Sequence, residues 1–305
     1  MEWLIGAMVG LLGLLSLWTM VTVILQDVKI IPALLIERSK NPVIPNGVCG
    51  ISFPTGDGVI IDVWESAPLQ AEGHTAPPLL FNHGNGHTNE LFWSYQCRFR
   101  DLGFHTYGYD YRGVARSTGW PAERGIETDA AAILTMIAQR HGISTSQVIV
   151  MGISLGTGPA CYLAEKFNSH RLLLYTPYLS LPELVRTIPG VSFLSRFVWY
   201  KFPNRERLIR WFIRPDMPRE LILVHGEDDR VIPFSHSEGI VAEIQGHSVS
   251  GLSVSGSSVS GSMGAKFIRF ISAPIAAHDV VIETTWEEVA KELKNWVRHN
   301  ESADY

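Results

Sequence analysis

The sequence is poor in cysteine, has no excess of positive charge, and contains no cysteine motif. Only Cys49, Cys97 and Cys161 occur in 305 residues, and no two of them have CxxC spacing. This odd, widely spaced set excludes a disulfide framework and a cysteine zinc site, and it weakly favours a reducing compartment. The net charge of −5 gives no general attraction to polyanions, so no nucleic-acid partner is expected.

The N-terminal segment lacks charge altogether. Residues 3–25 carry no charged side chain and are dominated by Leu, Val, Met, Gly and Trp. A helix of about 23 residues spans roughly 35 Å, which is enough to cross a bilayer core. Trp3 occupies the position of an interfacial anchor. We therefore expect an uncleaved transmembrane anchor over residues 1–28.

Two other interpretations of this segment remain. A cleaved signal peptide is disfavoured because no Lys or Arg precedes the apolar run and no small-x-small cleavage site ends it. A buried helix of a soluble protein is the second alternative. Lys29, Arg38 and Lys40 follow the apolar run, whereas only Glu2 and the terminal amine precede it, so the positive-inside rule predicts a cytoplasmic catalytic domain.

The remainder of the chain is long enough, and with 46% hydrophobic residues apolar enough, to form one domain of about 250 residues. We predict a linker over 29–48 and this domain over 49–305. Short β-rich runs at 51–53 and 59–64, separated by a Gly-Asp-Gly turn, predict an opening antiparallel hairpin.

After the hairpin, short apolar runs alternate with longer amphipathic stretches. The predicted strands are 78–82, 106–109, 148–151, 172–175, 221–224 and 267–271, and the predicted helices are 90–102, 126–141, 156–167, 235–244 and 285–299. This alternation predicts an α/β fold with a mostly parallel, doubly wound sheet. Ligands bind such sheets at the carboxyl ends of the strands.

One segment interrupts the alternation. Residues 248–262 form a threefold Ser/Gly-rich pentad, SVSGL-SVSGS-SVSGS. Such a composition buries too little apolar surface to offset its ordering entropy, which predicts a flexible surface loop over 247–264. The repeat is either an expansion without a role or a mobile flap over the active site.

The strongest local motif is GISLG, formed by Gly152 to Gly156 with Ser154 at its centre. It lies directly between an apolar strand and an Ala-bearing helix, the context of a nucleophile elbow. The glycines are needed because the tight turn brings its backbone against the neighbouring strand and helix. Ser154 is therefore the predicted nucleophile.

A serine hydroxyl needs a base, and the base needs a carboxylate that fixes its tautomer. In the order Ser, acid, His, the strand at 221–224 leads into the loop HGEDDRVIP, where Asp229 is the predicted acid and Asp228 the alternative. His278 is the only histidine between the final predicted strand and the final predicted helix, which makes it the predicted base.

Donors for the developing oxyanion are expected from two backbone N–H groups, those of Leu155 and Asn85. Asn85 lies in the turn HGNGH, directly after the strand at 78–82. A metal site at His83 and His87 is the alternative for this turn, but its two glycines disfavour the helix that such a pair needs. We therefore assign no metal and no cofactor.

With HGNGH, GISLG, HGEDDRVIP and AAHD in this order, the sequence resembles the alpha/beta-hydrolase superfamily, in particular its small-capped, membrane-anchored branch of serine aminopeptidase-like and lysophospholipase-like hydrolases. The segment DYRGVARS at 110–117 is similar to that branch's DYRGxGxS turn, although Ala115 replaces the usual glycine. The resemblance covers about residues 50 to 300. It implies an ester, thioester or amide substrate and does not say which.

A segment at 179–215 is expected to cap the active site. Its cationic residues are Arg186, Arg196, Lys201, Arg205, Arg207, Arg210 and Arg214, and its aromatic residues are Phe193, Phe197, Trp199, Tyr200, Phe202, Trp211 and Phe212. This combination suits an anionic interface or an acyl chain, or else a solvated helix whose aromatic residues pack on the core.

The sequence therefore predicts a membrane-anchored serine hydrolase that cleaves an ester or thioester of a lipid-derived or lipidated substrate. Membrane lipid and a lipid or small-molecule ester are the expected partners. The alternatives are a membrane-tethered binding or scaffold protein on a hydrolase fold, and a serine peptidase.

Overall fold

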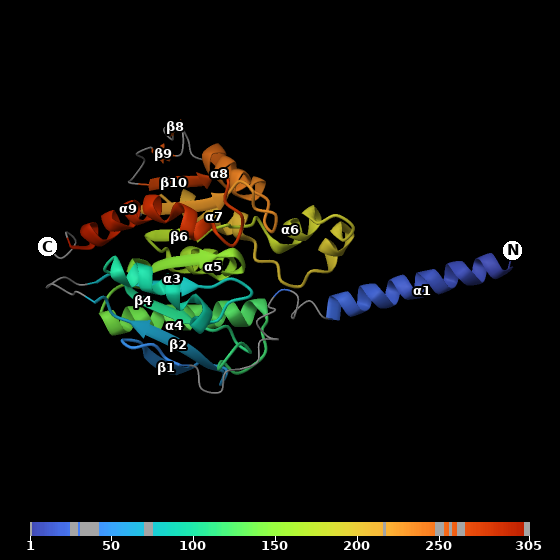
Figure 1. Ribbon diagram of the computed structural model, residues 1–305, viewed down its shortest axis with the longest axis horizontal. Helices are drawn as coiled ribbons and strands as arrows, with labels where there is room; N and C mark the ends of the chain where they lie inside the picture. Colours follow the sequence, from blue (N-terminus) through green and yellow to red (C-terminus); the bar gives the residue numbers. More distant parts are fainter. Residues whose placement is uncertain are drawn as a thin grey trace.

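The computed structural model describes most of the chain, with gaps near the N-terminus and around the Ser/Gly repeat. The described residues are 2–24, 30, 43–69, 76–215, 218–247, 253–255, 258–260 and 266–301. Most of the predicted linker, and with it Lys29, Arg38 and Lys40, lies outside the described residues. Within them, one twisted sheet is covered by helices on both faces (Figure 1).

The sheet is mostly parallel, as the alternating pattern predicted. Its strands lie in the order β1-β2-β4-β3-β5-β6-β7-β10-β9-β8. They are β1 (Cys49–Pro54), β2 (Ile60–Ser66), β3 (Pro78–Asn82), β4 (His105–Tyr109), β5 (Ile149–Ile153), β6 (Arg171–Tyr175), β7 (Arg219–Gly226), β8 (Ser253–Ser255), β9 (Ser258–Ser260) and β10 (Lys266–Ala273). Six neighbouring strands are parallel to one another: β4, β3, β5, β6, β7 and β10. At one edge of the sheet, β1 and β2 form the expected antiparallel hairpin.

Two apolar layers enclose the sheet because its central strands are buried on both faces. Leu79 and Phe81 of β3 pack against α3 (Asn89–Asp101) and α9 (Val281–Glu301), whereas Leu80 points to the opposite layer. That second layer contains α4 (Glu123–His141), α5 (Thr157–Phe167) and α8 (Ser235–His247). Because the central strands are parallel, their carboxyl ends lie along one rim of the sheet.

The described parts of the Ser/Gly repeat form two short strands within the segment that the sequence predicted to be a flexible surface loop. β8 and β9 pair antiparallel, and β9 pairs antiparallel with β10, where Ser260 lies opposite Phe267 and Val259 lies opposite Ile268. The physical reason is the Ser-Val-Ser alternation, in which a β-branched residue favours extended backbone, next to a sheet edge that offers free backbone groups. The rest of the repeat lies outside the described residues, and its flexibility stays a prediction.

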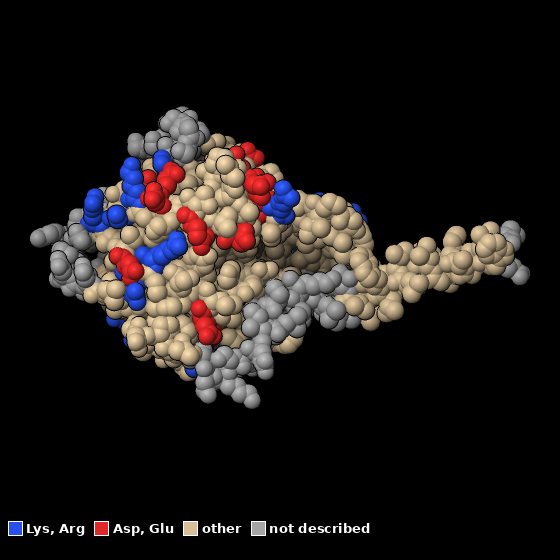
Figure 2. Space-filling model, viewed as in Figure 1, with Lys and Arg blue, Asp and Glu red and all other residues tan. Residues whose placement is uncertain are grey.

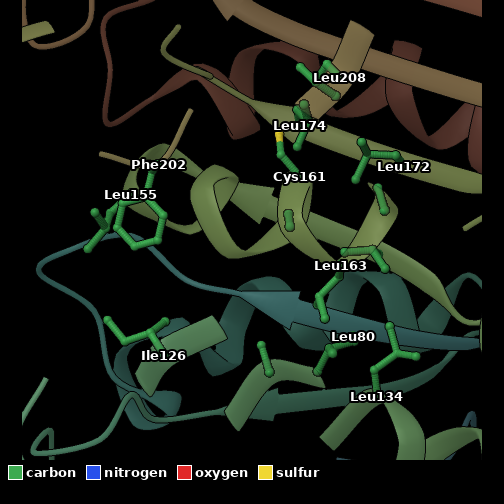
Figure 3. Close-up of a cluster of buried hydrophobic side chains, with 14 of the residues drawn as sticks. Leu80, Ile126, Leu134, Leu155, Cys161, Leu163, Leu172, Leu174, Phe202 and Leu208 are labelled. Atoms are coloured by element: carbon green, nitrogen blue, oxygen red, sulfur yellow. The ribbon is translucent and has the colours of Figure 1, made fainter. Parts of the chain in front are cut away.

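The segment between β6 and β7 forms a small helical cap. It contains α6 (Leu181–Thr187), a 3-10 segment (Ser192–Phe197) and α7 (Asn204–Ile213). Phe202 and Leu208 enter the same apolar cluster as Leu155 and Leu174, as Figure 3 shows. The cap is thus packed onto the core from one end of the sheet.

The charged and aromatic residues of the cap divide into two groups. Tyr200, Phe202, Trp211 and Phe212 are buried, whereas Phe193, Phe197 and Trp199 are exposed. Three cations of α7 pair with carboxylates: Arg205 with Glu183, Arg207 with Glu127, and Arg210 with Glu165. The predicted cationic surface is therefore smaller than its sequence suggested, because these arginines help to dock α7.

The N-terminal helix α1 (Glu2–Ile24) projects away from the domain (Figure 1). Its stretch Trp3–Val21 has a mean hydropathy of 2.1 and is not buried against the rest of the protein. These 19 residues span about 29 Å, close to the thickness of a hydrocarbon core. α1 is thus a candidate transmembrane helix. The Trp18 ring lies 6.3 Å from that of Phe193 in the cap.

Candidate active site

Ser154 lies in a sharp turn between β5 and α5. Its φ of +52° is in the left-handed region, which a serine rarely adopts without support. A Cβ on Gly152 would lie 2.5 Å from the carbonyl oxygen of Gly156, and one on Gly156 would lie 2.0 Å from that of Asn82. Both glycines of the motif are therefore required by backbone contacts, which is the geometry of a nucleophile elbow.

Ser154, His278 and Asp229 lie together at the carboxyl ends of β5, β10 and β7. His278 Nε2 is 3.1 Å from Ser154 Oγ, and its Nδ1 is 2.7 Å from Asp229 Oδ2. The Asp229 side chain is fully buried, and that of His278 is 20% exposed. The hydroxyl of Ser154 can thus pass its proton to the imidazole of His278, whose other nitrogen faces the carboxylate of Asp229.

Asp228, the alternative acid, lies elsewhere. Its side chain is 59% exposed, and its carboxylate is 3.9 Å from the guanidinium of Arg230. Adjacent residues on a loop after a strand point in different directions, and only the second of the two aspartates faces the imidazole. The geometry therefore selects Asp229 over Asp228.

The carboxylate of Asp229 accepts hydrogen bonds on both oxygens. Its Oδ1 accepts the N–H groups of Val231 and Ile232, each at 2.8 Å. Burial alone raises the pKa of Asp229, but hydrogen bonds from His225 and His278 outweigh that effect and hold the pKa well below its usual range. Asp229 is therefore ionised at neutral pH and can orient the imidazole of His278.

His225 is a supporting residue to which the sequence analysis gave no role. It is fully buried at the end of β7, with Nε2 3.3 Å from Asp229 Oδ2 and 2.9 Å from the carbonyl oxygen of Ile232. Its Nδ1 is 2.6 Å from the hydroxyl of Ser237. Nε2 donates to the oxygens, so Nδ1 accepts from the hydroxyl. The only sequence signal was a histidine next to the glycine that opens the acid loop.

The peptide planes that carry the two predicted oxyanion donors are both held by hydrogen bonds. Thr157 Oγ1 donates to the carbonyl oxygen of Ser154 at 2.7 Å, which fixes the plane bearing the Leu155 N–H. The carbonyl oxygen of Gly84 is 2.8 Å from His83 Nδ1 and accepts the backbone N–H of residue 87 at 3.2 Å, which fixes the plane bearing the Asn85 N–H.

The turn with Asn85 also lies directly against the nucleophile. A Cβ on Gly84 would lie 3.6 Å from Ser154 Cβ. The assignment of the Leu155 and Asn85 N–H groups as oxyanion donors stays a prediction, but both peptides are fixed beside the hydroxyl.

His83 has a structural task in this turn. Burial lowers its pKa to about 3, so the imidazole stays neutral, and its ring packs 4.2 Å from that of Tyr111. The hydroxyl of Tyr111 donates to the carbonyl oxygen of His83 at 2.6 Å. His83 Nδ1 carries the proton that it donates to the carbonyl oxygen of Gly84, so this nitrogen has no lone pair for a metal ion.

The turn with Ala115 keeps the conformation that a glycine normally supplies. Ala115 has a φ of +44°, which costs an ordinary residue on the order of 1 kcal/mol. Two ion pairs flank it: Arg112 with Asp129 at 2.6 Å and Arg116 with Asp62 at 2.7 Å. The departure from the glycine pattern therefore changes the strain of a supporting turn and leaves the geometry around Ser154 intact.

Comparisons with known proteins agree with this fold. A family model described as alpha/beta hydrolase fold matches residues 77–176. The alpha/beta hydrolase domain-containing protein aho-3 of Caenorhabditis elegans is 31% identical over 53% of this chain and 46% of its own length. The lysophosphatidylserine lipase ABHD12 of Gallus gallus is 27% identical over 76% of this chain and 68% of its own length. The human alpha/beta hydrolase domain-containing protein 17B is 28% identical over 55% of each chain.

Solved structures match over most of the chain at low identity. Esterase 2 of Thermogutta terrifontis, phosphoramylated by tabun, has a TM-score of 0.60 and 13% identity, and the match covers 85% of this chain and 97% of that one. The Pyrococcus furiosus esterase Pf2001 has a TM-score of 0.60 and 12% identity, with coverage of 86% and 98%. The sheet, the elbow and these matches show that the chain has the alpha/beta-hydrolase fold. It spans about half the length of two of the relatives named above.

Proposed function

We propose that this protein is a membrane-anchored serine hydrolase that cleaves an ester or thioester of a lipid-derived or lipidated substrate. The observation that carries the proposal is the His278 imidazole, which lies within hydrogen-bonding distance of Ser154 Oγ on one side and Asp229 Oδ2 on the other.

The chemistry follows from the protonation state of each group. Ionised Asp229 accepts the Nδ1–H of His278, so Nε2 carries the lone pair that takes the proton of the Ser154 hydroxyl. The hydroxyl oxygen then attacks the substrate carbonyl carbon. His278 returns the proton to the leaving group, and water attacks the acyl-enzyme in the same manner.

The negative charge that develops on the carbonyl oxygen needs donors that are already in position. The N–H groups of Leu155 and Asn85 fill this role in the proposal, because hydrogen bonds from Thr157 and His83 prevent their peptides from turning. A fixed donor requires no reorganisation when charge develops, which is why such donors accelerate acyl transfer.

The lipid class of the substrate is supported by two independent points. One relative, ABHD12 of Gallus gallus, is named a lysophosphatidylserine lipase. The candidate transmembrane helix α1 would also keep the domain at a membrane, where lipid substrates are concentrated. A peptidase would need the same three residues, and a scaffold would need none of them.

Serine-directed labelling tests the proposal. The full-length protein in detergent or liposomes is treated with a fluorescent fluorophosphonate, which reacts with an activated serine. We expect labelling of the wild type, loss of labelling in Ser154→Ala, and full labelling in Ser94→Ala, a matched control at an exposed position of α3. Labelling that survives Ser154→Ala would refute the nucleophile, and a wild type that does not label would favour the scaffold.

A substrate panel then separates the ester and thioester from the amide. Long-chain lysophospholipids, long-chain acyl thioesters and peptide amides are offered to the same preparation. Turnover of the amides alone would assign a peptidase and overturn the proposed substrate class.

A further inference from the structure

Exposed apolar side chains ring the end of the sheet that carries the candidate active site. Each of them lies on a segment that follows the carboxyl end of a parallel strand: Leu91 after β3, Trp120 after β4, Ile188, Phe193, Phe197 and Trp199 after β6, Val231 after β7, and Ile275 and Val280 after β10. We call these nine residues the apolar rim. Ile275, three residues before His278, is 89% exposed.

This distribution is uneven over the domain. Among the described residues outside α1, the other exposed large apolar side chains are Val43, Ile60, Leu69 and Ile213. Scattered apolar residues on a surface need no explanation, but a contiguous set around one site marks a contact with a partner or a membrane. The nine residues of the apolar rim all lie on connections at the end of the sheet where Ser154 and His278 meet.

The candidate transmembrane helix reaches the same end of the molecule. Trp18 of α1 contacts Phe193 of the apolar rim, and in Figure 1 α1 leaves the body on the side of α6. Trp18 lies three residues before Val21, the end of the apolar span, which is about 4.5 Å along the helix axis. If α1 crosses a bilayer, Phe193 is therefore at the depth of the membrane interface.

Charge on the cap is compatible with this position. Arg186, which precedes the exposed apolar residues of the cap, and Arg196, which lies among them, are themselves exposed. Arginines beside interfacial aromatic residues attract anionic lipid headgroups. Figure 2 shows the surface hollowed beside the cap near the base of α1.

We infer that the apolar rim is a membrane-contact surface, which rests in the bilayer that holds α1, so that substrate passes from the lipid layer to Ser154 without crossing water. The inference rests on the proposed membrane anchor and deepens the proposed function by naming the route of the substrate. A lipid surface is the partner of the apolar rim, because Phe193 of the rim contacts Trp18 of α1.

The test measures contact with lipid without using activity. In a Cys49→Ser background, which removes the exposed native thiol, a fluorescent nitrobenzoxadiazole group is attached at Ile275→Cys in the full-length protein. The protein is reconstituted into liposomes of phosphatidylcholine with phosphatidylserine, with and without brominated acyl chains. Ile213→Cys is the matched control, since Ile213 is exposed but precedes β7 at the opposite end of the sheet.

We expect brominated lipid to reduce the emission at position 275 at least twofold, and to leave that at position 213 within about 10%. Equal quenching at the two positions would overturn the inference. Protection of position 275 from aqueous iodide without quenching by brominated lipid would assign the apolar rim to a protein partner, and would also overturn it.

Activity gives a second, separate readout. Ile275→Asp should lower hydrolysis of a long-chain lysophospholipid in liposomes at least tenfold. The control, Ile213→Asp, should not show this loss. The Ile275→Asp variant should leave hydrolysis of a soluble short-chain ester within about twofold. An equal fall on both substrates would contradict the route from the bilayer. A wild type that does not react with a fluorophosphonate would refute the proposed function, while the quenching experiment would still test the surface.

Discussion

Replacement of Asp229 by asparagine should nearly abolish turnover while leaving the fold intact. The reason lies in how the carboxylate is held. Its Oδ1 accepts two backbone N–H groups, from Val231 and Ile232, and its Oδ2 faces His278 Nδ1. In Asp229→Asn the side-chain oxygen must stay with the two backbone donors, so the amide NH₂ takes the position opposite the imidazole.

The imidazole must then change its tautomer. An NH₂ group can only donate to Nδ1, so the proton of neutral His278 moves to Nε2, the nitrogen that faces Ser154 Oγ at 3.1 Å. A protonated Nε2 cannot accept the serine proton. Loss of the correct tautomer in a Ser-His-Asp triad lowers kcat about 10⁴-fold, which corresponds to about 5 kcal/mol of activation free energy.

The assay is the rate of ester hydrolysis by the full-length protein, with the rate of fluorophosphonate labelling as a second measurement. Asp228→Asn is the matched control, because this neighbour has an exposed side chain and should retain activity within about twofold. An Asp229→Asn protein with more than a tenth of wild-type activity would refute the role of the carboxylate. So would an equal loss in the Asp228→Asn protein.

Two further predictions concern pH and packing. The lowered pKa of Asp229 keeps its carboxylate ionised in mildly acidic solution, so the rate of hydrolysis should rise with pH because only a neutral imidazole accepts the serine proton; a rate that does not change with pH would contradict a histidine base. Gly156→Ala should lower the free energy of unfolding by about 1–3 kcal/mol, measured by urea denaturation, because its Cβ would meet a backbone oxygen at 2.0 Å. Gly86→Ala, whose Cβ would meet nothing within 4 Å, should leave the free energy of unfolding nearly unchanged.

Much of the fold could be predicted because its strands are buried on both faces. Apolar runs such as that of β3, predicted and found at Pro78–Asn82, have no other place in a soluble domain. Helix starts were less predictable: α4 begins at Glu123 and α9 at Val281, three and four residues before their predicted starts. The first turn of a helix depends on local backbone hydrogen bonds, which an apolar pattern does not reveal.

The candidate site was predictable where one strand end carries one distinctive residue. Ser154, at the centre of the GISLG motif after one strand, and His278, which follows two alanines after another, are examples. The support that His225 gives to Asp229 was not predictable, because its hydrogen bonds depend on how the acid loop curls back over the strand. The cap was also ambiguous, since a sequence does not tell whether an arginine such as Arg207 meets solvent or the carboxylate of Glu127.

The close approach of Gly156 to Asn82 has a consequence for motion. The elbow and the turn after β3 touch through backbone atoms, so they must shift together or not at all. His278 comes from a separate segment, 124 positions along the chain from Ser154. A local opening of that segment would withdraw the imidazole while the hydroxyl and its neighbouring amides kept their arrangement. Hydrogen exchange should therefore be faster in the backbone around His278 than in β5, and reversible inactivation should precede global unfolding.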